Sequence, residues 1–287
     1  MPPPTCSLYL TADIDRRQAA RSLSTVIVMA IVGMRINRGL QLRLIRLPGI
    51  HHDSTCILLL GSTSSAIIDP GTSWYQVNVE ARIAPHLEGR AAVEHILLTH
   101  RHFDSAGAAS HLSVIHGADI RVHMAATNAL SSGDPFTTWA SRYDSDMPIV
   151  DAEGFEEGES IDLGDTIVEV IHTPGHTVDS VCFHIADRGA VICGDTIPSA
   201  SHPSRADMPT GNLIELAESL EKIRALKPKL LVCGRGEPVK GSDAVDAVLS
   251  LHIESVEQRI ESQGALPDGW PKPAPTCHWL TPEPAWD

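Results

Sequence analysis

Short apolar runs and longer amphipathic segments alternate along the chain from Leu40 onward. Short runs bounded by turn residues are typical of strands, whereas apolar residues recurring at roughly every third or fourth position are typical of helices. The runs that predict strands are 42–47, 56–60, 66–68, 95–98, 120–123, 166–172, 180–185, 190–193 and 230–233. The spacing predicts helices over 74–87, 213–223 and 244–260. This repeated order predicts an α/β fold in which two similar halves pack sheet to sheet.

Two terminal segments fall outside this alternation, which predicts one domain over 40–266. Residues 1–39 contain arginines ahead of a short apolar stretch at 26–32, well below the ~20 residues needed to span a bilayer. We interpret them as a dispensable extension rather than an export signal, with translation starting at Met34 as the alternative. Residues 267–287 are rich in proline and predict an irregular tail.

Composition is typical of a globular protein with an acidic surface. Hydrophobic residues make up 43% and charged residues 20% of the chain, and the formal net charge is -14. Such a surface repels the phosphates of nucleic acids, so we expect a small-molecule substrate and no nucleic-acid partner. The six cysteines form no C-x-x-C pair, which is typical of reduced thiols in a cytoplasmic protein. We expect no stable membrane insertion and leave a homodimer open.

One short segment, Thr99–Ser105 (T-H-R-H-F-D-S), concentrates groups that bind metal ions. It follows the apolar run 96–98 and precedes small residues that predict a helix, so it lies where a strand ends. His100 and His102 are two residues apart in a non-helical turn, so both can reach one cation at the ~2.0–2.1 Å that zinc requires. The segment therefore predicts a metal site.

Three later segments also place polar groups directly after predicted strands. They are Thr173–Thr177 (T-P-G-H-T) with His176, Cys193–Thr196 (C-G-D-T) with Asp195, and Cys233–Gly236 (C-G-R-G) with Arg235. Because strand ends followed by small residues can meet at one rim, we expect these groups to share a site with the first segment. The mostly polar segment 131–151, which contains Trp139 and Tyr143, predicts either a lid near this site or a plain connecting loop.

In this order the motifs resemble those of the metallo-β-lactamase-fold superfamily, which includes glyoxalase II-like thioesterases, lactonases and related hydrolases. The family pattern is T-H-x-H-x-D-H, then P-G-H-T, then G-D, then G-H-G, and the resemblance extends over about 40–266. It implies a four-layer αββα sandwich with two metals at one edge of the sheets. It also implies that His100, His102 and His176 hold the first metal. Asp195 would then bridge to a second metal, completed by Asp104 and two further histidines.

Two residues depart from this pattern, and both affect the second metal. Ser105 stands where the first motif ends in His, and Arg235 stands where G-H-G supplies a His. A guanidinium is always protonated and cannot bind a metal. We therefore predict one metal on three neutral nitrogens plus a carboxylate or water, zinc being expected and iron the alternative. Arg235 is predicted to neutralise Asp104 or Asp195 or to grip an anionic substrate, with a merely structural arginine as the remaining alternative.

The predicted activity is metal-dependent hydrolysis of a small ester, thioester or lactone. Asp104 and Arg235 are the predicted catalytic residues, and Asp104 would position or deprotonate the water that the metal activates. One alternative is a non-haem iron oxygenase resembling the persulfide dioxygenases of this fold, with His100, His176 and Asp195 as iron ligands. Another is a catalytically degenerate binding protein. The substrate itself does not follow from the fold.

Overall fold

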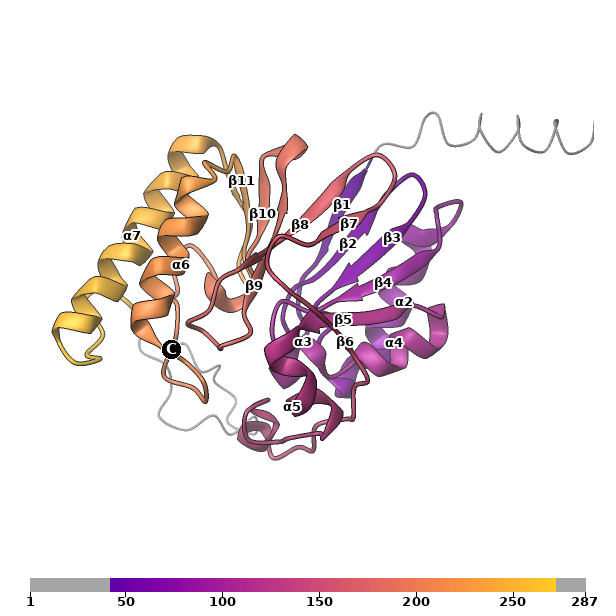
Figure 1. Ribbon diagram of the computed structural model, residues 1–287, viewed down its shortest axis with the longest axis horizontal. Helices are drawn as coiled ribbons and strands as arrows, with labels where there is room; N and C mark the ends of the chain where they lie inside the picture. The colour runs from indigo at the N-terminus through magenta and orange to yellow at the C-terminus, as the bar shows by residue number, and fades with distance from the viewer. Residues whose placement is uncertain (1–41, 272–287) are drawn as a thin grey trace, which may run out of the picture. The chain divides into compact units, whose positions relative to one another are not determined.

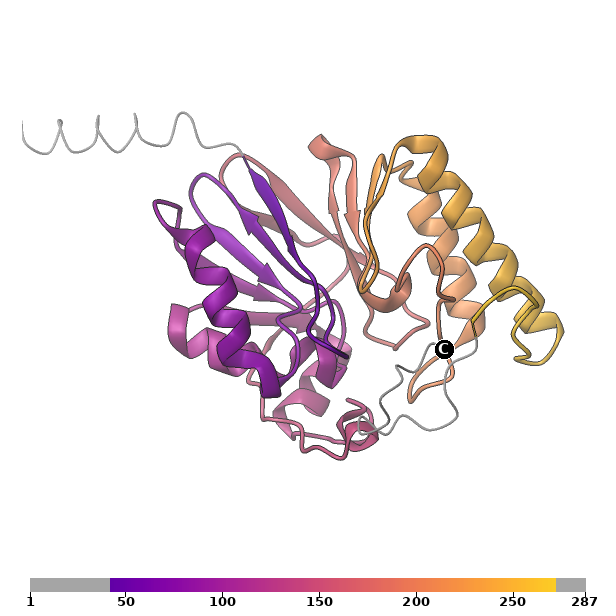
Figure 2. The same ribbon diagram turned by 180° about the vertical axis from the view of Figure 1, so that it is seen from behind.

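The computed structural model describes residues 42–271, in which two six-stranded sheets lie face to face. Helices α2 (Gln76–Leu87) and α4 (Ala109–His116) cover the outer face of the first sheet (Figure 1). Helices α6 (Leu213–Ala225) and α7 (Ser242–Glu261) cover the outer face of the second, as Figure 2 shows from behind. The predicted four-layer αββα sandwich is thereby confirmed.

The first sheet is built from the N-terminal half of the described chain. Its strands lie in the order β1 (Arg43–Leu47), β2 (Cys56–Leu60), β3 (Ser65–Ile68), β4 (Val93–Leu97), β5 (Asp119–His123) and β6 (Glu153–Phe155). β1 to β3 pair antiparallel, whereas β3 to β6 pair in parallel. Parallel neighbours need crossover connections. These connections contain α2, the short helix α3 (Phe103–Ala106), α4 and α5 (Thr127–Ser131).

The second sheet is mostly antiparallel. Its strands lie in the order β12 (Val239–Lys240), β11 (Leu230–Val232), β10 (Ala190–Ile192), β9 (Val181–Ile185), β8 (Ile167–His172) and β7 (Ser160–Asp162). Only β10 and β11 pair in parallel within this sheet, and α6 lies in the connection between them.

Three apolar layers fill the spaces between the four structural layers. Because successive side chains of a strand point to opposite faces, Ile57 and Leu59 of β2 enter the layer between the sheets. Leu58 and Leu60 enter the layer beneath α2 and α4. Strands with both faces covered read as continuous apolar runs, which is why the sequence pattern located β2 so closely.

The ends of four strands meet at one edge of the sandwich, as the motifs predicted. The turn after β4 contains His102, and the turn after β8 brings His176 against it. Asp195 follows β10 and Arg235 follows β11, and both line the same cavity as His102. The two halves therefore contribute jointly to one site.

Some elements were not predicted from the sequence. β6, β7 and β12 are strands of only three, three and two residues, most of which are not buried, so they produce no apolar run. The segment 131–151 contains a 3-10 helix at Ala140–Tyr143. The predicted extension at 1–39 and the tail beyond residue 271 lie outside the described residues, and 267–271 contains neither helix nor strand.

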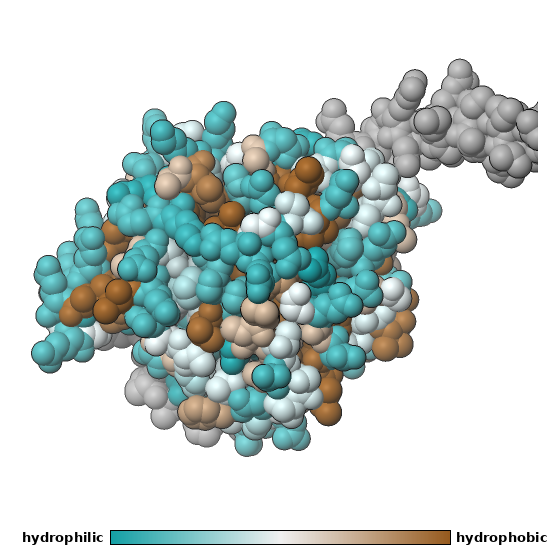
Figure 3. All heavy atoms as spheres, in the orientation of Figure 1, coloured by the Kyte–Doolittle hydropathy of each residue, from teal (hydrophilic) through white to brown (hydrophobic). Residues whose placement is uncertain are grey.

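The surface in Figure 3 is mostly hydrophilic, and its apolar residues form small separate groups. None of the helices within residues 42–271 has the length and apolar character required to cross a membrane.

Gly194 determines how closely the end of β10 can approach the end of β4. Its φ of 50° is left-handed, and an added Cβ would lie 2.3 Å from Thr99 Oγ1. Thr99 immediately precedes His100, and Gly194 immediately precedes Asp195. This close approach therefore fixes two predicted site residues relative to each other.

Replacing Gly194 with Ala is expected to destabilise the fold more than the same change at Gly117. Both glycines have left-handed backbones, with φ of 50° and 66°, but an added Cβ at Gly117 meets nothing within 4 Å. Gly117→Ala should cost about 1 kcal/mol of unfolding free energy. Gly194→Ala should cost roughly 1–3 kcal/mol more because of overpacking. Urea unfolding measures both, and equal losses would show that the approach to Thr99 is not constrained.

Candidate metal centre

Three buried histidines converge where the two halves meet. His100 and His102 lie in the turn after β4, and His176 lies in the turn after β8. Their exposed fractions are 1%, 3% and 1%. One potential ligand atom from each lies within 4.8 Å of those of the other two. The structure thus brings together the three nitrogen donors expected for the first metal.

A buried ion pair joins the two turns that carry these histidines. The Arg101 Nε donates to Asp179 Oδ1 at 2.6 Å, and the Arg101 backbone N–H donates to Asp179 Oδ2 at 2.9 Å. The side chains are only 6% and 0% exposed. The backbone N–H of Val181 also donates to the Thr99 carbonyl at 2.8 Å. A buried pair with several hydrogen bonds is costly to break, so the turn after β4 is held firmly against the turn after β8.

Hydrogen bonds at the far side of two rings determine which nitrogen is available to a metal. The Thr99 hydroxyl donates to Asp69 Oδ2 at 2.6 Å, so its oxygen, 2.9 Å from His100 Nδ1, accepts from that ring. The Arg205 carbonyl, 3.0 Å from His176 Nδ1, can likewise only accept. Both rings therefore carry a proton on Nδ1 and, when neutral, a lone pair on Nε2. Outer hydrogen bonds of this kind are typical of metal-binding histidines.

These lone pairs fit a cation. His100 Nε2 is buried and has no hydrogen-bond partner in the described part of the chain. His176 Nε2 lies 3.1 Å from His102 Nδ1. Two nitrogen ligands of one tetrahedral zinc ion lie about 3.3 Å apart at the usual bond lengths. The donor set and its spacing therefore suit a metal with nitrogen ligands.

Burial keeps the rings of His102 and His176 in the neutral form that binds metals. Burial, followed by the proximity of His100, lowers the pKa of His176 to about 4. The same two causes, with His176 adding to them, lower the pKa of His102 well below its ordinary value. Protons therefore do not compete for the nitrogens of these two rings at neutral pH.

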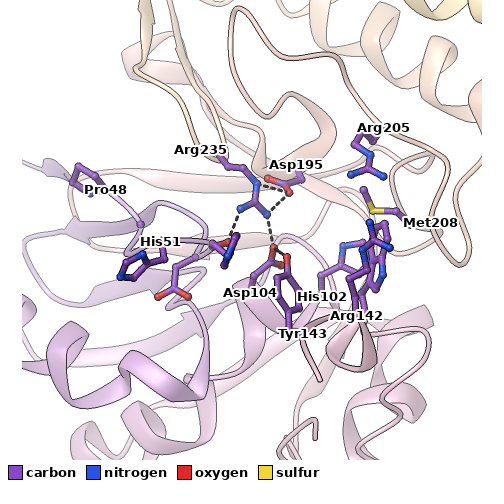
Figure 4. Close-up of a pocket in the computed structure, with 14 residues that line it drawn as sticks. Pro48, His51, His102, Asp104, Arg142, Tyr143, Asp195, Arg205, Met208 and Arg235 are labelled. Atoms are coloured by element: carbon purple, nitrogen blue, oxygen red, sulfur yellow. Dashed lines mark hydrogen bonds and ion pairs between the residues drawn. The ribbon is translucent and has the colours of Figure 1, made fainter. Parts of the chain in front are cut away.

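Beside the histidines, one guanidinium lies between two buried carboxylates (Figure 4). Arg235 Nη2 donates to Asp104 Oδ2 and, at 2.8 Å, to Asp195 Oδ2, while Nε donates to Asp195 Oδ2 at 3.1 Å. Arg235 Nη1 donates to the His52 carbonyl at 2.6 Å. The exposed fractions of the Asp104 and Asp195 side chains are 6% and 7%. Arg235 is therefore paired with both acids, where the sequence predicted one or the other.

The guanidinium outweighs the effect of burial on Asp195. Burial by itself raises the pKa of this carboxyl, but Arg235, followed by His176 and His100, lowers it to about 2. For Arg235, burial is likewise outweighed by Asp195 and Asp104, which raise its pKa well above the ordinary value. The Arg235–Asp195 pair is therefore charged across the neutral pH range.

Neither Asp195 nor Ser105, which replaces a histidine of the family pattern, is part of the histidine cluster. Asp195 is not among the residues whose ligand atoms lie within 4.8 Å of one another. Its Oδ2 is bound by Arg235, and its Oδ1 is buried without a hydrogen-bond partner among the described residues. Its role as a metal ligand stays a prediction. Ser105 is fully buried, and its Oγ lies 2.5 Å from Ser54 Oγ, so it contacts Ser54 rather than the cavity.

A cavity of about 250 Å³ adjoins the centre. Trp139, Arg142 and Tyr143 line it, so the segment 131–151 lies at the site and is more than a plain connecting loop. The Tyr143 hydroxyl donates to Asp104 Oδ2 at 3.2 Å. These contacts depend on how the segment folds over the turn after β4, and only the presence of aromatic residues in it was visible in the sequence.

Asp53 is a further acid in the cavity that sequence analysis missed. It is 5% exposed, and its Oδ1 accepts from the Thr72 backbone N–H at 3.1 Å. Burial is the main cause that raises its pKa to about 7, although the Thr72 hydrogen bonds lower it. The negative charge of Asp104 raises this pKa further, by more than the positive charge of Arg235 lowers it. One guanidinium therefore does not neutralise all three acids. No motif in the sequence indicates Asp53, because only its position in the loop after β1 places it here.

Residues 50–235 match the family model of the metallo-beta-lactamase superfamily. The chain belongs to this superfamily. The crystal structure of BLEG-1 B3 metallo-beta-lactamase superimposes with a TM-score of 0.60 at 21% identity, covering 76% of this chain and 97% of that one. At that identity the likeness shows the fold alone.

Two curated relatives within the superfamily are named as hydrolases. Hydroxyacylglutathione hydrolase of Acidiphilium cryptum is 31% identical over 220 residues, which are 74% of this chain and 79% of that protein. Acyl-coenzyme A thioesterase MBLAC2 of Gallus gallus is 27% identical over 150 residues, 47% of this chain and 52% of that protein. The chain thus spans about half the length of the second relative.

Replacing Arg235 with Met is expected to lower the free energy of unfolding by roughly 3–5 kcal/mol at pH 7.5 in the presence of a chelator, because two buried carboxylates lose their counter-charge. The loss should shrink at pH 4.5. In the wild type, the contribution of Asp195 is complete above its ordinary pKa of 3.8 and is lost only as the pH falls through about 2. In the variant, burial raises the pKa of the unpaired Asp195, so acidification relieves the destabilisation.

The matched control for this measurement is Arg46→Met. Arg46 pairs with Glu237, whose side chain is 82% exposed, so its loss should cost less than about 1 kcal/mol at either pH. If Arg235→Met costs no more than Arg46→Met, the two carboxylates do not depend on the guanidinium.

Proposed function

We propose that the chain is a metal-dependent hydrolase that holds a single metal ion on His100, His102 and His176. The observation that carries this proposal is the binding of one guanidinium to both Asp104 and Asp195. A second metal at these acids would be repelled by a permanent positive charge. Three neutral nitrogens are the ligand set typical of catalytic zinc.

A thioester is the substrate class that we propose. A Lewis-acidic metal on three nitrogens supplies activation of water and polarisation of an acyl carbonyl. The names of the two relatives, a hydroxyacylglutathione hydrolase and an acyl-coenzyme A thioesterase, support thioesters ahead of simple esters and lactones.

Asp104 is the residue proposed to orient the attacking water. Its Oδ2 is fixed by Arg235 and Tyr143, so the carboxylate cannot rotate freely. Its Oδ1 has no hydrogen-bond partner among the described residues and can accept a proton or a hydrogen bond from water. Arg235 acts by holding this carboxylate and that of Asp195 in place.

The iron oxygenase alternative is less favoured by the geometry. It requires Asp195 to join His100 and His176 as a ligand, yet Asp195 is not part of the histidine cluster and is bound by Arg235. The catalytically degenerate alternative is disfavoured because the three nitrogen donors remain arranged to bind a cation.

Protein purified without added metal or chelator is expected to contain about one zinc ion per chain and to release thiol from acetyl thioesters. His100→Ala should lose the metal and lower kcat/KM at least about 100-fold, because changes to the hydrogen-bond partners of metal ligands alone cost 10- to 100-fold. Elemental analysis and a thiol assay measure both effects.

The control is His184→Ala, since His184 lies on β9 and bonds Glu169 at 3.0 Å, and this variant should keep metal and activity. Two metals per chain would contradict the single site. A metal-loaded protein that hydrolyses no thioester, ester or lactone would contradict the hydrolase. Iron together with oxygen consumption on a persulfide would support the oxygenase instead.

A further inference from the structure

Three arginines line the cavity, and they differ in how their charges are balanced. Arg235 is paired with two buried carboxylates, as described above. Arg205 is paired with Asp207, to which its Nη2 donates at 2.5 Å. No carboxylate among the described residues forms an ion pair with Arg142. Its Nε is buried without a hydrogen-bond partner. Arg142 is therefore the cavity arginine whose charge is left without an acid.

Arg142 and Arg205 share one aromatic ring. Their guanidinium carbons lie 5.4 Å and 5.3 Å from the centroid of the Trp139 ring. Cation–π contacts of this kind are favourable, but they do not supply a counter-ion. Arg142, one of the two positive groups beside this ring, forms no ion pair with a carboxylate of the described residues, so an anion bound there would balance its charge.

The shared ring is fixed beside the metal centre. Trp139 has a left-handed backbone with φ of 59°, an uncommon conformation that a bulky residue adopts only at a cost. Its ring packs edge to face on His102, with centroids 5.6 Å apart. The carbonyl of Arg205 accepts the hydrogen bond from His176. The two arginines are consequently held at a defined position relative to two of the metal-binding histidines.

We propose that Arg142, assisted by Trp139 and Arg205, binds an oxyanion group of the substrate, a carboxylate or a phosphate, so that the enzyme selects anionic acyl thioesters. Figure 4 shows Arg142, Met208 and Arg205 on one side of Arg235 and His51 on the other. The anion would therefore bind on the Arg142 side of the cavity, beside the thioester group that reacts. A planar guanidinium pairs with either oxyanion through two parallel hydrogen bonds. The reaction in this inference rests on the proposed hydrolase function, whereas the anion site can be tested by binding alone.

Charge and size support this assignment. The chain has a formal net charge of -14, yet Arg142 contributes to the cavity a positive charge that no described acid pairs with. Such a group raises the local concentration of anions. The cavity of about 250 Å³ lies below the ~300–1,000 Å³ typical of pockets that enclose a whole ligand. It would enclose the acyl end and the adjoining part of the thiol, while the rest of a large thiol extends into solvent.

The test compares three acetyl thioesters that differ in the charge of the thiol. S-acetyl-N-acetylcysteamine is neutral, S-acetylglutathione carries carboxylates and acetyl-coenzyme A carries phosphates. In Arg142→Met, the ratio of kcat/KM for the preferred anionic substrate to that for the neutral one is expected to fall about 10- to 100-fold, mainly through KM. Arg142→Lys keeps the charge but not the planar fork, so its ratio should fall less.

The control is Arg224→Met, an exposed arginine on α6 that pairs with Glu221 and should leave every ratio unchanged. A fall confined to S-acetylglutathione identifies a carboxylate, and one confined to acetyl-coenzyme A identifies a phosphate. Equal losses on all three substrates in Arg142→Met would overturn the inference, because they indicate a structural role. An unchanged ratio for both anionic substrates would overturn it as well.

A binding measurement separates this inference from the proposed function. Binding of free glutathione and of free coenzyme A to metal-loaded wild type and to Arg142→Met is followed by tryptophan fluorescence. If the wild type hydrolyses no thioester, the proposed function fails, but at least one of these thiols should still bind about 10-fold more tightly to the wild type. Equal affinities of both proteins for both thiols would overturn the anion site whatever the kinetics.

Discussion

Two negative charges from opposite halves of the chain have to share one buried edge of the sandwich. Asp104 follows a strand of the first sheet and Asp195 a strand of the second, and both side chains are more than nine-tenths buried. Like charges in a poorly hydrated interior repel strongly, so a cation has to lie between them. In the superfamily pattern a second metal with further histidines fills this role. Here a guanidinium belonging to the chain itself pairs with both acids.

Because the cation is an arginine, the charges of Asp104 and Asp195 are balanced without a bound metal. Because Arg235 is always protonated, the two carboxylates stay paired whether or not a metal is bound. The three histidines are positioned by other contacts, including the Arg101–Asp179 ion pair. The outer hydrogen bonds of His100 and His176 leave a lone pair on Nε2 of each neutral ring. The three histidines can therefore be in place before a metal binds, and the positions of Asp104 and Asp195 do not depend on that metal.

Much of this site could be predicted from the sequence, because its main residues directly follow apolar runs. The strands themselves were recognisable where their residues are buried, as in Cys56–Leu60 and the three-residue Ala190–Ile192. Short strands with exposed residues, as in Glu153–Phe155, were missed. Pairing of Arg235 with a carboxylate was one of three roles that the sequence left open, and it was suggested by the chemistry of a guanidinium placed where a histidine ligand is expected. That it binds two acids rather than one is a matter of three-dimensional distance.

The rest of the cavity depends on contacts between segments distant in sequence. Asp53 lies in the loop after β1, and nothing in the pattern around it indicates an acid whose pKa burial raises to about 7. Arg142 and Arg205 are separated by more than sixty residues, and only the fold brings both to Trp139. Periodicity reports which residues are buried in an element, but it carries no information on which loops meet above the strand ends.

A crystal structure of metal-loaded protein, with anomalous scattering at the zinc edge, would show whether Arg235 takes the place of the second metal. We expect one anomalous peak, among His100, His102 and His176, with the Arg235 guanidinium still between Asp104 and Asp195. A second peak between those two carboxylates, with Arg235 displaced, would show that a metal and not the arginine balances them.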